Sequence, residues 1–139
     1  MTKKDQKEII DISEIPESQQ RYLDVIYTIS RKNMGGWVSN KEIAENLNVE
    51  PASVSGMLEK LVKNDLIIWK PRKAIRLSER GKKIAIQLSE IHGILRIFFR
   101  EVLKIKDETV IEDLSCEIEH HITQDVKRSL SDFLSNYLD

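Results

Sequence analysis

The chain has 139 residues, of which 40% are hydrophobic and 32% are charged, and its formal net charge at pH 7 is −1. This length suits one domain, or two small domains that share a core. No apolar run approaches the roughly 20 residues of a membrane-spanning helix, and the single cysteine excludes an intramolecular disulfide, so we expect a cytoplasmic protein.

Residues 1–17 form a charged N-terminal arm that contains a short apolar patch between Ile9 and Ile15. The sequence leaves open whether this patch packs against the body of the protein or is disordered. Apolar residues then recur at helical spacing from Ser18 to Lys32, which predicts the first helix. The glycine pair Gly35-Gly36 ends this region, because paired glycines break helices.

A helix-turn-helix pattern follows. Ser39 is a suitable N-cap, and Glu42, three residues later, completes a capping box for a helix that reaches Leu47. After a short turn, Pro51 stands where proline is favoured, in the first turn of the next helix. The outer face of this second helix carries small and basic residues, as a recognition helix in the DNA major groove requires.

The next segment predicts a β-hairpin. Leu66 to Trp69 alternates as a strand, residues 70–73 form a basic turn, and the chain returns through Ile75 and Leu77. Trp37-Val38 is a candidate for a brief strand that pairs with this hairpin. A helix-turn-helix with a basic wing is typical of a DNA-binding domain and is more specific than an ordinary helix pair. The predicted DNA contacts are Ser39, Lys41, Pro51, Ala52, Ser53, Ser55, Gly56, Lys60, Lys70, Arg72 and Lys73.

The small net charge hides an asymmetry between the two halves. Residues 19–83 contain thirteen basic and seven acidic residues, a net charge of +6. Residues 84–139 contain six basic and eleven acidic residues, a net charge of −5. A basic half favours attraction to the DNA phosphates, and an acidic half favours solubility or a bound cation.

The second half predicts helices throughout. Ser78 is the predicted cap of a long helix that reaches Val102, and Ile94 and Ile97 widen its apolar face beyond the needs of one small domain. A second copy of the chain is the commonest partner for such a face, although the later helices could also cover it. Those helices are predicted at Thr109–Leu114 and Cys116–Leu138. We therefore expect a mainly α fold with an arm at 1–17, a winged helix-turn-helix domain at 18–77 and an all-helical dimerisation domain at 78–139.

Three potential metal ligands lie close together in this half. Cys116, Glu119 and His120 stand at i, i+3 and i+4, so one continuous helix would place them on one edge, and His92 lies on the preceding long helix. Thiolate, carboxylate and imidazole together form a ligand set for a divalent transition metal. The alternative is a half-buried cysteine beside ordinary surface charges.

The two patterns together resemble the DtxR/MntR family of metal-dependent transcriptional regulators. The resemblance runs from about Tyr22 to the C-terminus, and its most specific part is the segment from Cys116 to His121. It implies a homodimeric repressor of metal-uptake genes, not an enzyme, that binds a palindromic operator in double-stranded DNA with Fe(II) or Mn(II) as co-repressor. The implied metal ligands are Asp24, His92, Cys116, Glu119 and His120.

The sequence departs from the family at three positions that bear on the metal. Arg21 replaces a family ligand, and a permanent cation cannot bind a metal ion. Arg96 and Glu112 replace ligands of an ancillary site, and of these only Glu112 retains a donor atom. A winged-helix regulator that no longer needs metal, with Arg21 in place of a ligand, is therefore the alternative. A metallohydrolase is a third possibility, but the chain has no H-E-x-x-H motif or phosphate-binding loop to support it.

Overall fold

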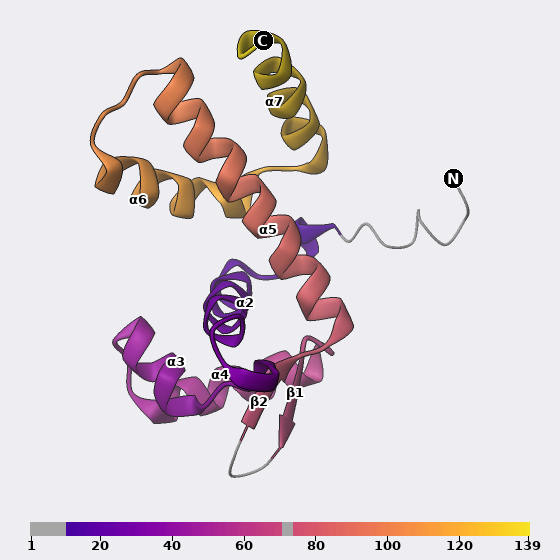
Figure 1. The fold of residues 1–139 in the computed structure, drawn as a ribbon. Helices are drawn as coiled ribbons and strands as arrows, with labels where there is room; N and C mark the ends of the chain where they lie inside the picture. The colour runs from indigo at the N-terminus through magenta and orange to yellow at the C-terminus, as the bar shows by residue number, and fades with distance from the viewer. Residues whose placement is uncertain (1–10, 71–73) are drawn as a thin grey trace, which may run out of the picture. The chain divides into compact units, whose positions relative to one another are not determined.

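The structure is a computed structural model that describes residues 11–70 and 74–139, and in these residues it is mainly helical with one two-stranded sheet (Figure 1). The described residues divide into two compact units. Unit 1 contains residues 16–85, and unit 2 contains residues 11–15 and 86–139. The predicted wing-tip contacts Arg72 and Lys73 lie outside the described residues.

Unit 1 is a winged helix-turn-helix, which confirms the predicted fold class. Its elements are α2 (Glu17–Ser30), η2 (Met34–Gly36), α3 (Asn40–Leu47), α4 (Pro51–Lys63), β1 (Ile67–Lys70), β2 (Ala74–Leu77) and the first residues of α5 (Glu79–Ile97). The three-helix core is apolar and fully enclosed. Its buried side chains include Leu23, Ile26, Ile43, Val54, Leu58 and Leu61.

Local sequence signals explain how the helix-turn-helix is formed. The Ser39 hydroxyl accepts a hydrogen bond from the Glu42 backbone N–H (3.1 Å), and the Glu42 carboxylate accepts one from the Ser39 N–H (3.0 Å). This is the predicted capping box of α3. Asn48 ends α3 in the left-handed conformation (φ 56°), and Pro51 opens α4 at its first turn.

An isolated β-bridge joins Val38 to the hairpin, at the place where the sequence predicts a brief strand. Val38 and Ile75 exchange two backbone hydrogen bonds of 2.8 Å each, so the segment before α3 is fastened to β2. Within the hairpin, Ile68 pairs with Arg76. Ile67 and Ile75 are buried while Ile68 and Arg76 are exposed, so one face of the hairpin joins the core and the other faces solvent.

The start of α5 is packed tightly against the entry to β1. A Cβ atom added to Gly81 would lie 2.0 Å from the backbone oxygen of Leu66, which no real side chain tolerates. The Ser78 hydroxyl accepts a hydrogen bond from the Gly81 N–H (3.0 Å) and donates one to the Asp65 carbonyl (2.7 Å). Ser78 is therefore the predicted helix cap, and it also links α5 to the turn before the hairpin.

Unit 2 is entirely helical in its described residues. It comprises η1 (Ile12–Glu14), α5 from residue 86 onward, a π-helical turn η3 (Phe98–Val102), α6 (Glu108–Ile118), η4 (Glu119–His121) and α7 (Gln124–Tyr137). In η1 and directly after it, Ile12 and Ile15 are buried, and η1 contacts η4. Residues 12–15 therefore pack against the rest of unit 2, which is the first of the two alternatives that the sequence left open for this apolar patch.

The prediction of one continuous last helix from Cys116 to Leu138 is wrong. The shorter helix predicted at 109–114 instead extends to Ile118, the 3₁₀ turn η4 follows, and Ile122 is extended. A new helix then starts after Thr123, whose side chain accepts a hydrogen bond from the Val126 N–H (3.3 Å). The apolar spacing fits one helix or two, and the Thr123 cap decides between them.

No helix in the described residues has the length and apolar character that a membrane span needs.

Candidate metal centre and DNA-binding surface

The predicted DNA-contacting face of α4 is exposed. Pro51, Ala52, Ser53, Gly56 and Lys60 are all solvent-accessible, and no atom lies within 4 Å of a Cβ added to Gly56. Without a Cβ, Gly56 lets the helix backbone approach a neighbouring surface closely. This face of the helix therefore presents small side chains and a weak positive charge to solvent.

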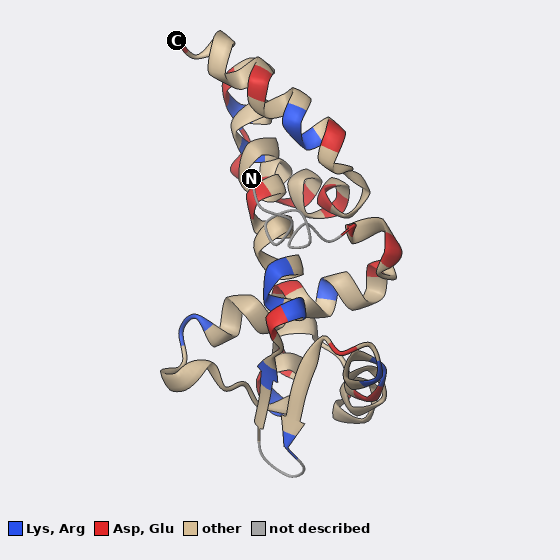
Figure 2. Cartoon of the chain, turned by 90° about the vertical axis from the view of Figure 1, so that its right-hand side faces the viewer, with Lys and Arg blue, Asp and Glu red and all other residues tan. Residues whose placement is uncertain are grey.

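Basic residues flank this helix on both sides. Lys41 is exposed on α3, and Lys70 is exposed at the end of β1. Figure 2 shows Lys and Arg positions, in blue, on both strands of the hairpin. Exposed basic residues of this kind are suited to binding DNA phosphates.

Ser55 has a structural role that the sequence analysis did not predict. Its hydroxyl accepts a hydrogen bond from the Asn40 side-chain amide (3.0 Å) and donates one to the Pro51 carbonyl (3.2 Å). Asn40 is the first residue of α3, so these bonds tie α3 to the first turn of α4. The sequence did not indicate this contact, since only the fold brings Asn40 to Ser55.

The centre of unit 2 brings together three side chains from three elements. His92 of α5 lies between Glu112 of α6 and Glu119 of η4. The distance from His92 Nε2 to Glu112 Oε1 is 3.1 Å, and that from His92 Nδ1 to Glu119 Oε1 is 3.5 Å. The hydrogen bond to Glu119 is the main reason that the pKa of His92 is raised, although burial of the ring opposes this effect.

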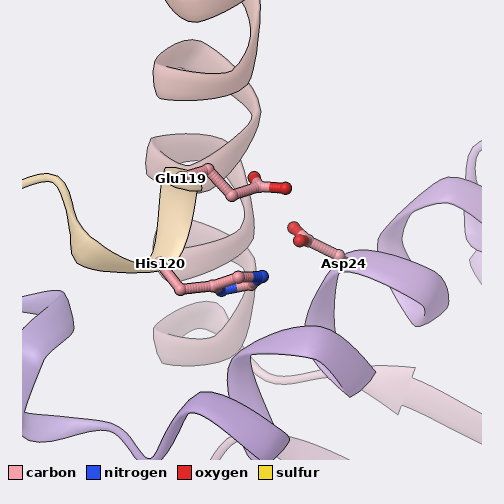
Figure 3. A group of neighbouring side chains, drawn as sticks. All are labelled: Asp24, Glu119 and His120. Carbon is pink, nitrogen blue, oxygen red and sulfur yellow. The ribbon is translucent and has the colours of Figure 1, made fainter. Parts of the chain in front are cut away.

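Glu119 and His120 are buried next to each other on η4. Glu119 is 3% exposed and His120 is 7% exposed, and Figure 3 shows that both side chains project to the same side of the turn. Carboxylates are almost never fully buried unless they are paired or bind a metal. A buried carboxylate and two imidazoles in one small helical unit are therefore candidates for a functional site.

The remaining predicted ligands lie in other surroundings. Cys116 is exposed on the last turn of α6, whereas Glu119 and His120 are buried on η4, which follows α6 directly. Asp24 is half-buried on α2 of unit 1, where Figure 3 labels it. Cys116, Glu119 and His120 therefore differ in their exposure to solvent, and their role as a common set of metal ligands stays a prediction.

The two arginines that depart from the family pattern each contact a carboxylate. Arg21 Nη2 lies 2.7 Å from Glu17 Oε1, one turn earlier on α2. Arg96 Nε lies 3.5 Å from Glu112 Oε2. Arg96 therefore places a fixed positive charge beside the carboxylate that holds His92.

One pair of side chains at the centre of unit 2, His92 and Glu119, is spaced suitably for a divalent metal ion. Imidazole nitrogen and carboxylate oxygen are common ligands of first-row transition metals. Two such donors at about 2.1 Å from one ion are at most about 4.2 Å apart. The 3.5 Å between His92 Nδ1 and Glu119 Oε1 lies within this limit.

Comparison with known proteins gives two family matches. "Iron dependent repressor, N-terminal DNA binding domain" matches residues 14–75, and "Iron dependent repressor, metal binding and dimerisation domain" matches residues 78–138. The HTH-type transcriptional regulator MntR of Oceanobacillus iheyensis is 30% identical over 122 residues, which cover 88% of this chain and 80% of that protein.

Two further similarities agree with these matches. An uncharacterised HTH-type transcriptional regulator of Methanocaldococcus jannaschii is 28% identical over 123 residues, covering 88% of this chain and 97% of that protein. Among solved structures, that of the manganese regulator SloR has a TM-score of 0.70 and 27% sequence identity, covering 84% of this chain and 53% of that one. The chain thus spans about half the length of the solved structure.

Proposed function

Because the chain belongs to the iron dependent repressor family, we propose that it is a metal-responsive transcriptional regulator that represses metal-uptake genes. The observation that carries this proposal is the pair of buried side chains Glu119 and His120, with the half-buried His92 beside Glu119, in the domain that matches the metal-binding model. The proposal assigns DNA recognition to unit 1, and metal binding and dimerisation to unit 2.

The DNA-binding role is supported by the exposed face of α4. The small residues Ala52, Ser53 and Gly56 allow close approach to base edges, with Lys60 and Lys70 placed for phosphates. Few of these side chains can read bases through hydrogen bonds. Recognition of a palindromic operator in double-stranded DNA would therefore depend partly on the shape of the DNA.

For the metal, we propose His92, Glu119 and His120 as ligands, completed by Asp24 and Cys116. A bound divalent cation would place further positive charge beside the buried carboxylate of Glu119. Asp24 belongs to unit 1 and the others to unit 2, so ligation by all five would link DNA-binding and dimerisation domains. Such a link would shift the protein toward the arrangement that binds DNA, provided that this arrangement binds the metal more tightly.

Two ions are candidates for the co-repressor, Fe(II) and Mn(II). A thiolate and imidazoles favour Fe(II), and a set richer in carboxylates favours Mn(II). The exposure of Cys116 reduces the case for the thiolate as a fixed ligand. The similar protein SloR is named as a manganese regulator, which supports testing that ion together with iron.

Dimerisation is supported by exposed aromatic and aliphatic side chains on unit 2. Val126, Phe133 and Tyr137 of α7 are each between 45% and 48% exposed. Phe133 stacks on Tyr137 with ring centres 5.6 Å apart, and a groove of about 420 Å³ lies between Phe98 and α7. An exposed apolar surface of this kind suits the interface of a homodimer. A regulator that binds DNA in this way would work in the cytoplasm.

The test is fluorescence anisotropy with fragments of the source genome at fixed salt. The protein is titrated with chelator present, with Fe(II) under anaerobic conditions, and with Mn(II). We expect DNA affinity to rise at least tenfold with one of the two metals, and H120A to lose this response while H121A, an exposed neighbour, keeps it. Equal affinity in chelator and metal would show instead that the regulator is independent of metal.

A further inference from the structure

An open cleft of about 520 Å³ lies in unit 1 beside the hairpin. We call it the hairpin cleft. It is lined by the end of α2 and the glycine turn that follows, by both strands, and by the start of α5. None of its lining residues comes from α3 or α4, so it is separate from the proposed base-reading surface.

The hairpin cleft carries an excess of positive charge. Arg31, Arg76 and Lys82 line it, against a single acidic residue, Glu79. In the part of the chain that the structure describes, none of these three cations forms an ion pair with a carboxylate. Four other arginines do form ion pairs with acidic side chains. They are Arg21, Arg96, Arg100 and Arg128.

Aromatic rings hold both arginines in place. The guanidinium carbon of Arg31 lies 5.4 Å from the ring centre of Tyr27, and that of Arg76 lies 5.3 Å from the ring centre of Trp37. A guanidinium stacked on a ring keeps its N–H groups free to donate in its own plane, in the fork that matches phosphate.

The backbone beside Arg76 leaves room for a ligand. Gly36 adopts φ +75°, a conformation that side chains rarely accept, and a Cβ there would lie 4.0 Å from Arg76 Nε. Arg76 stands on the solvent face of the hairpin, opposite the buried Ile67 and Ile75. The guanidinium edge is therefore accessible to an anion from outside.

We propose that the hairpin cleft binds a phosphate group, with Arg31 and Arg76 as hydrogen-bonding forks and Lys82 as a point charge. Its volume is in the range of small-molecule sites, which suits a nucleotide or pyrophosphate. The same chemistry would serve a phosphate of the DNA backbone outside the bases that α4 reads. With either source, the hairpin cleft would bind an anion in addition to the phosphate contacts proposed for Lys60 and Lys70.

The test uses the full chain with R31Q, R76Q and K63Q. Lys63 is an exposed lysine of α4 outside the cleft, so K63Q matches the charge change. Binding of ATP and of pyrophosphate is measured by isothermal titration calorimetry at low salt. We expect each arginine variant to bind at least tenfold more weakly than the wild type, K63Q to bind within twofold of it, and R76K to recover part of the loss.

A second measurement identifies the source of the phosphate. Operator affinity is measured by anisotropy over a range of salt concentrations. If the DNA backbone is the ligand, R31Q and R76Q each lower the slope of log affinity against log salt by about 0.9 in magnitude. If a nucleotide is the ligand, the slope stays as in K63Q while nucleotide binding is lost. Nucleotide binding and salt slopes that are the same in all three glutamine variants would overturn the proposal. Thermal melting checks that the variants remain folded.

Discussion

Glu112 determines which nitrogen of His92 faces the buried carboxylate Glu119. Glu112 lies 3.1 Å from Nε2, while Nδ1 is directed toward Glu119 at 3.5 Å. Arg96 in turn lies beside the second oxygen of Glu112. Metal-binding histidines commonly donate their other ring N–H to a carboxylate, which fixes the orientation of the ring. Glu112 is therefore a positioning residue for the proposed metal centre.

Replacing Glu112 with alanine should weaken metal binding about 10- to 100-fold, because the imidazole loses the carboxylate that orients it. E112Q should recover much of the loss, since its amide oxygen can still accept from Nε2–H. The measurement is competition with a fluorescent chelator. E108Q is the control, because Glu108 pairs with Arg100 elsewhere on unit 2. Unchanged affinity in E112A would show that the orientation of His92 does not depend on Glu112.

Glu42 makes the stability of unit 1 depend on pH. A hydrogen bond from the Asn33 side chain (2.9 Å) is the main cause that lowers the pKa of Glu42, burial opposes it, and the capping bonds with Ser39 add to it. A carboxylate with a lowered pKa stabilises the fold above its usual pKa, and this stabilisation is lost as the pH falls through the lowered value.

E42Q should therefore reduce the free energy of unfolding at pH 7 by about 1 kcal/mol. The difference from the wild type should shrink below about pH 4, where the native side chain also becomes neutral. Urea unfolding at pH 7 and pH 3.5 measures both values. E45Q, at an exposed position of α3, should have little effect at either pH. An E42Q difference that persists at low pH would contradict this explanation.

At the scale of elements, the sequence predicted unit 1 well because its signals are local. A capping box, a proline at the first turn of α4 and an alternating hairpin each act within a few residues, and all three are confirmed. The break at residues 119–123 was missed because Ile118, Ile122 and Val126 keep a helical spacing across it. The cap at Thr123 was the available signal.

The candidate metal site was predictable by residue type and not by geometry. The sequence grouped Cys116 with Glu119 and His120 on one edge, but it did not indicate that Cys116 is exposed while Glu119 and His120 are buried on the 3₁₀ turn η4. The contact between Glu112 and His92 links residues 20 positions apart. Contacts of that kind depend on helix packing, which spacing along the sequence does not encode.

At the junction between α5 and β1, Gly81 should be the position that least tolerates substitution. In G81A the new Cβ would meet the Leu66 carbonyl at 2.0 Å, and the backbone would have to move. We expect a loss of more than about 2 kcal/mol in the free energy of unfolding. G93A, on the same helix with nothing within 4 Å, should instead be neutral or stabilising by up to about 1 kcal/mol. Urea unfolding of the two variants compares them directly, and equal stabilities would be inconsistent with the close packing at Gly81.

At the scale of the whole molecule, the proposed regulator depends on contacts between copies and on contacts within unit 2 between segments far apart in the sequence. The basic residues 19–83 suit DNA, and the acidic residues 84–139 carry the metal and dimer surfaces. The N-terminal turn η1 belongs to unit 2, where it contacts the ligand-bearing η4. The segment before the DNA-binding domain therefore packs against the turn that carries two of the proposed metal ligands.

Truncating Ile12 should weaken that support. Ile12 is 4% exposed, and I12A should cost about 2–5 kcal/mol of stability in unit 2 and lower metal affinity in parallel. Thermal unfolding with and without metal, together with chelator competition, measures both effects. E14Q, at an exposed position of η1, is the control. Loss of stability with unchanged metal affinity would mean that η1 packs on unit 2 without affecting the ligands.

A charge at Phe133 should prevent dimer formation. Phe133 is 46% exposed and contacts the rings of Phe98 and Tyr137. In F133D we expect monomers by analytical ultracentrifugation and a loss of at least tenfold in operator affinity, because two half-sites can no longer be bound together. S131D, at an exposed position two residues earlier, should remain dimeric. A dimeric F133D would place the interface elsewhere.

The shortness of η4 has a consequence for how fast its amide hydrogens exchange with solvent. The bond from the Ile122 N–H to the Glu119 carbonyl is long, at 3.4 Å, and the segment it closes lies between two separately capped helices. Such a segment opens locally more often than the helices beside it. Its amide hydrogens should exchange with solvent deuterium fastest within unit 2, and metal should slow this exchange in proportion to its occupancy. Amide exchange at residues 119–123 would thus report metal occupancy even when no DNA is present.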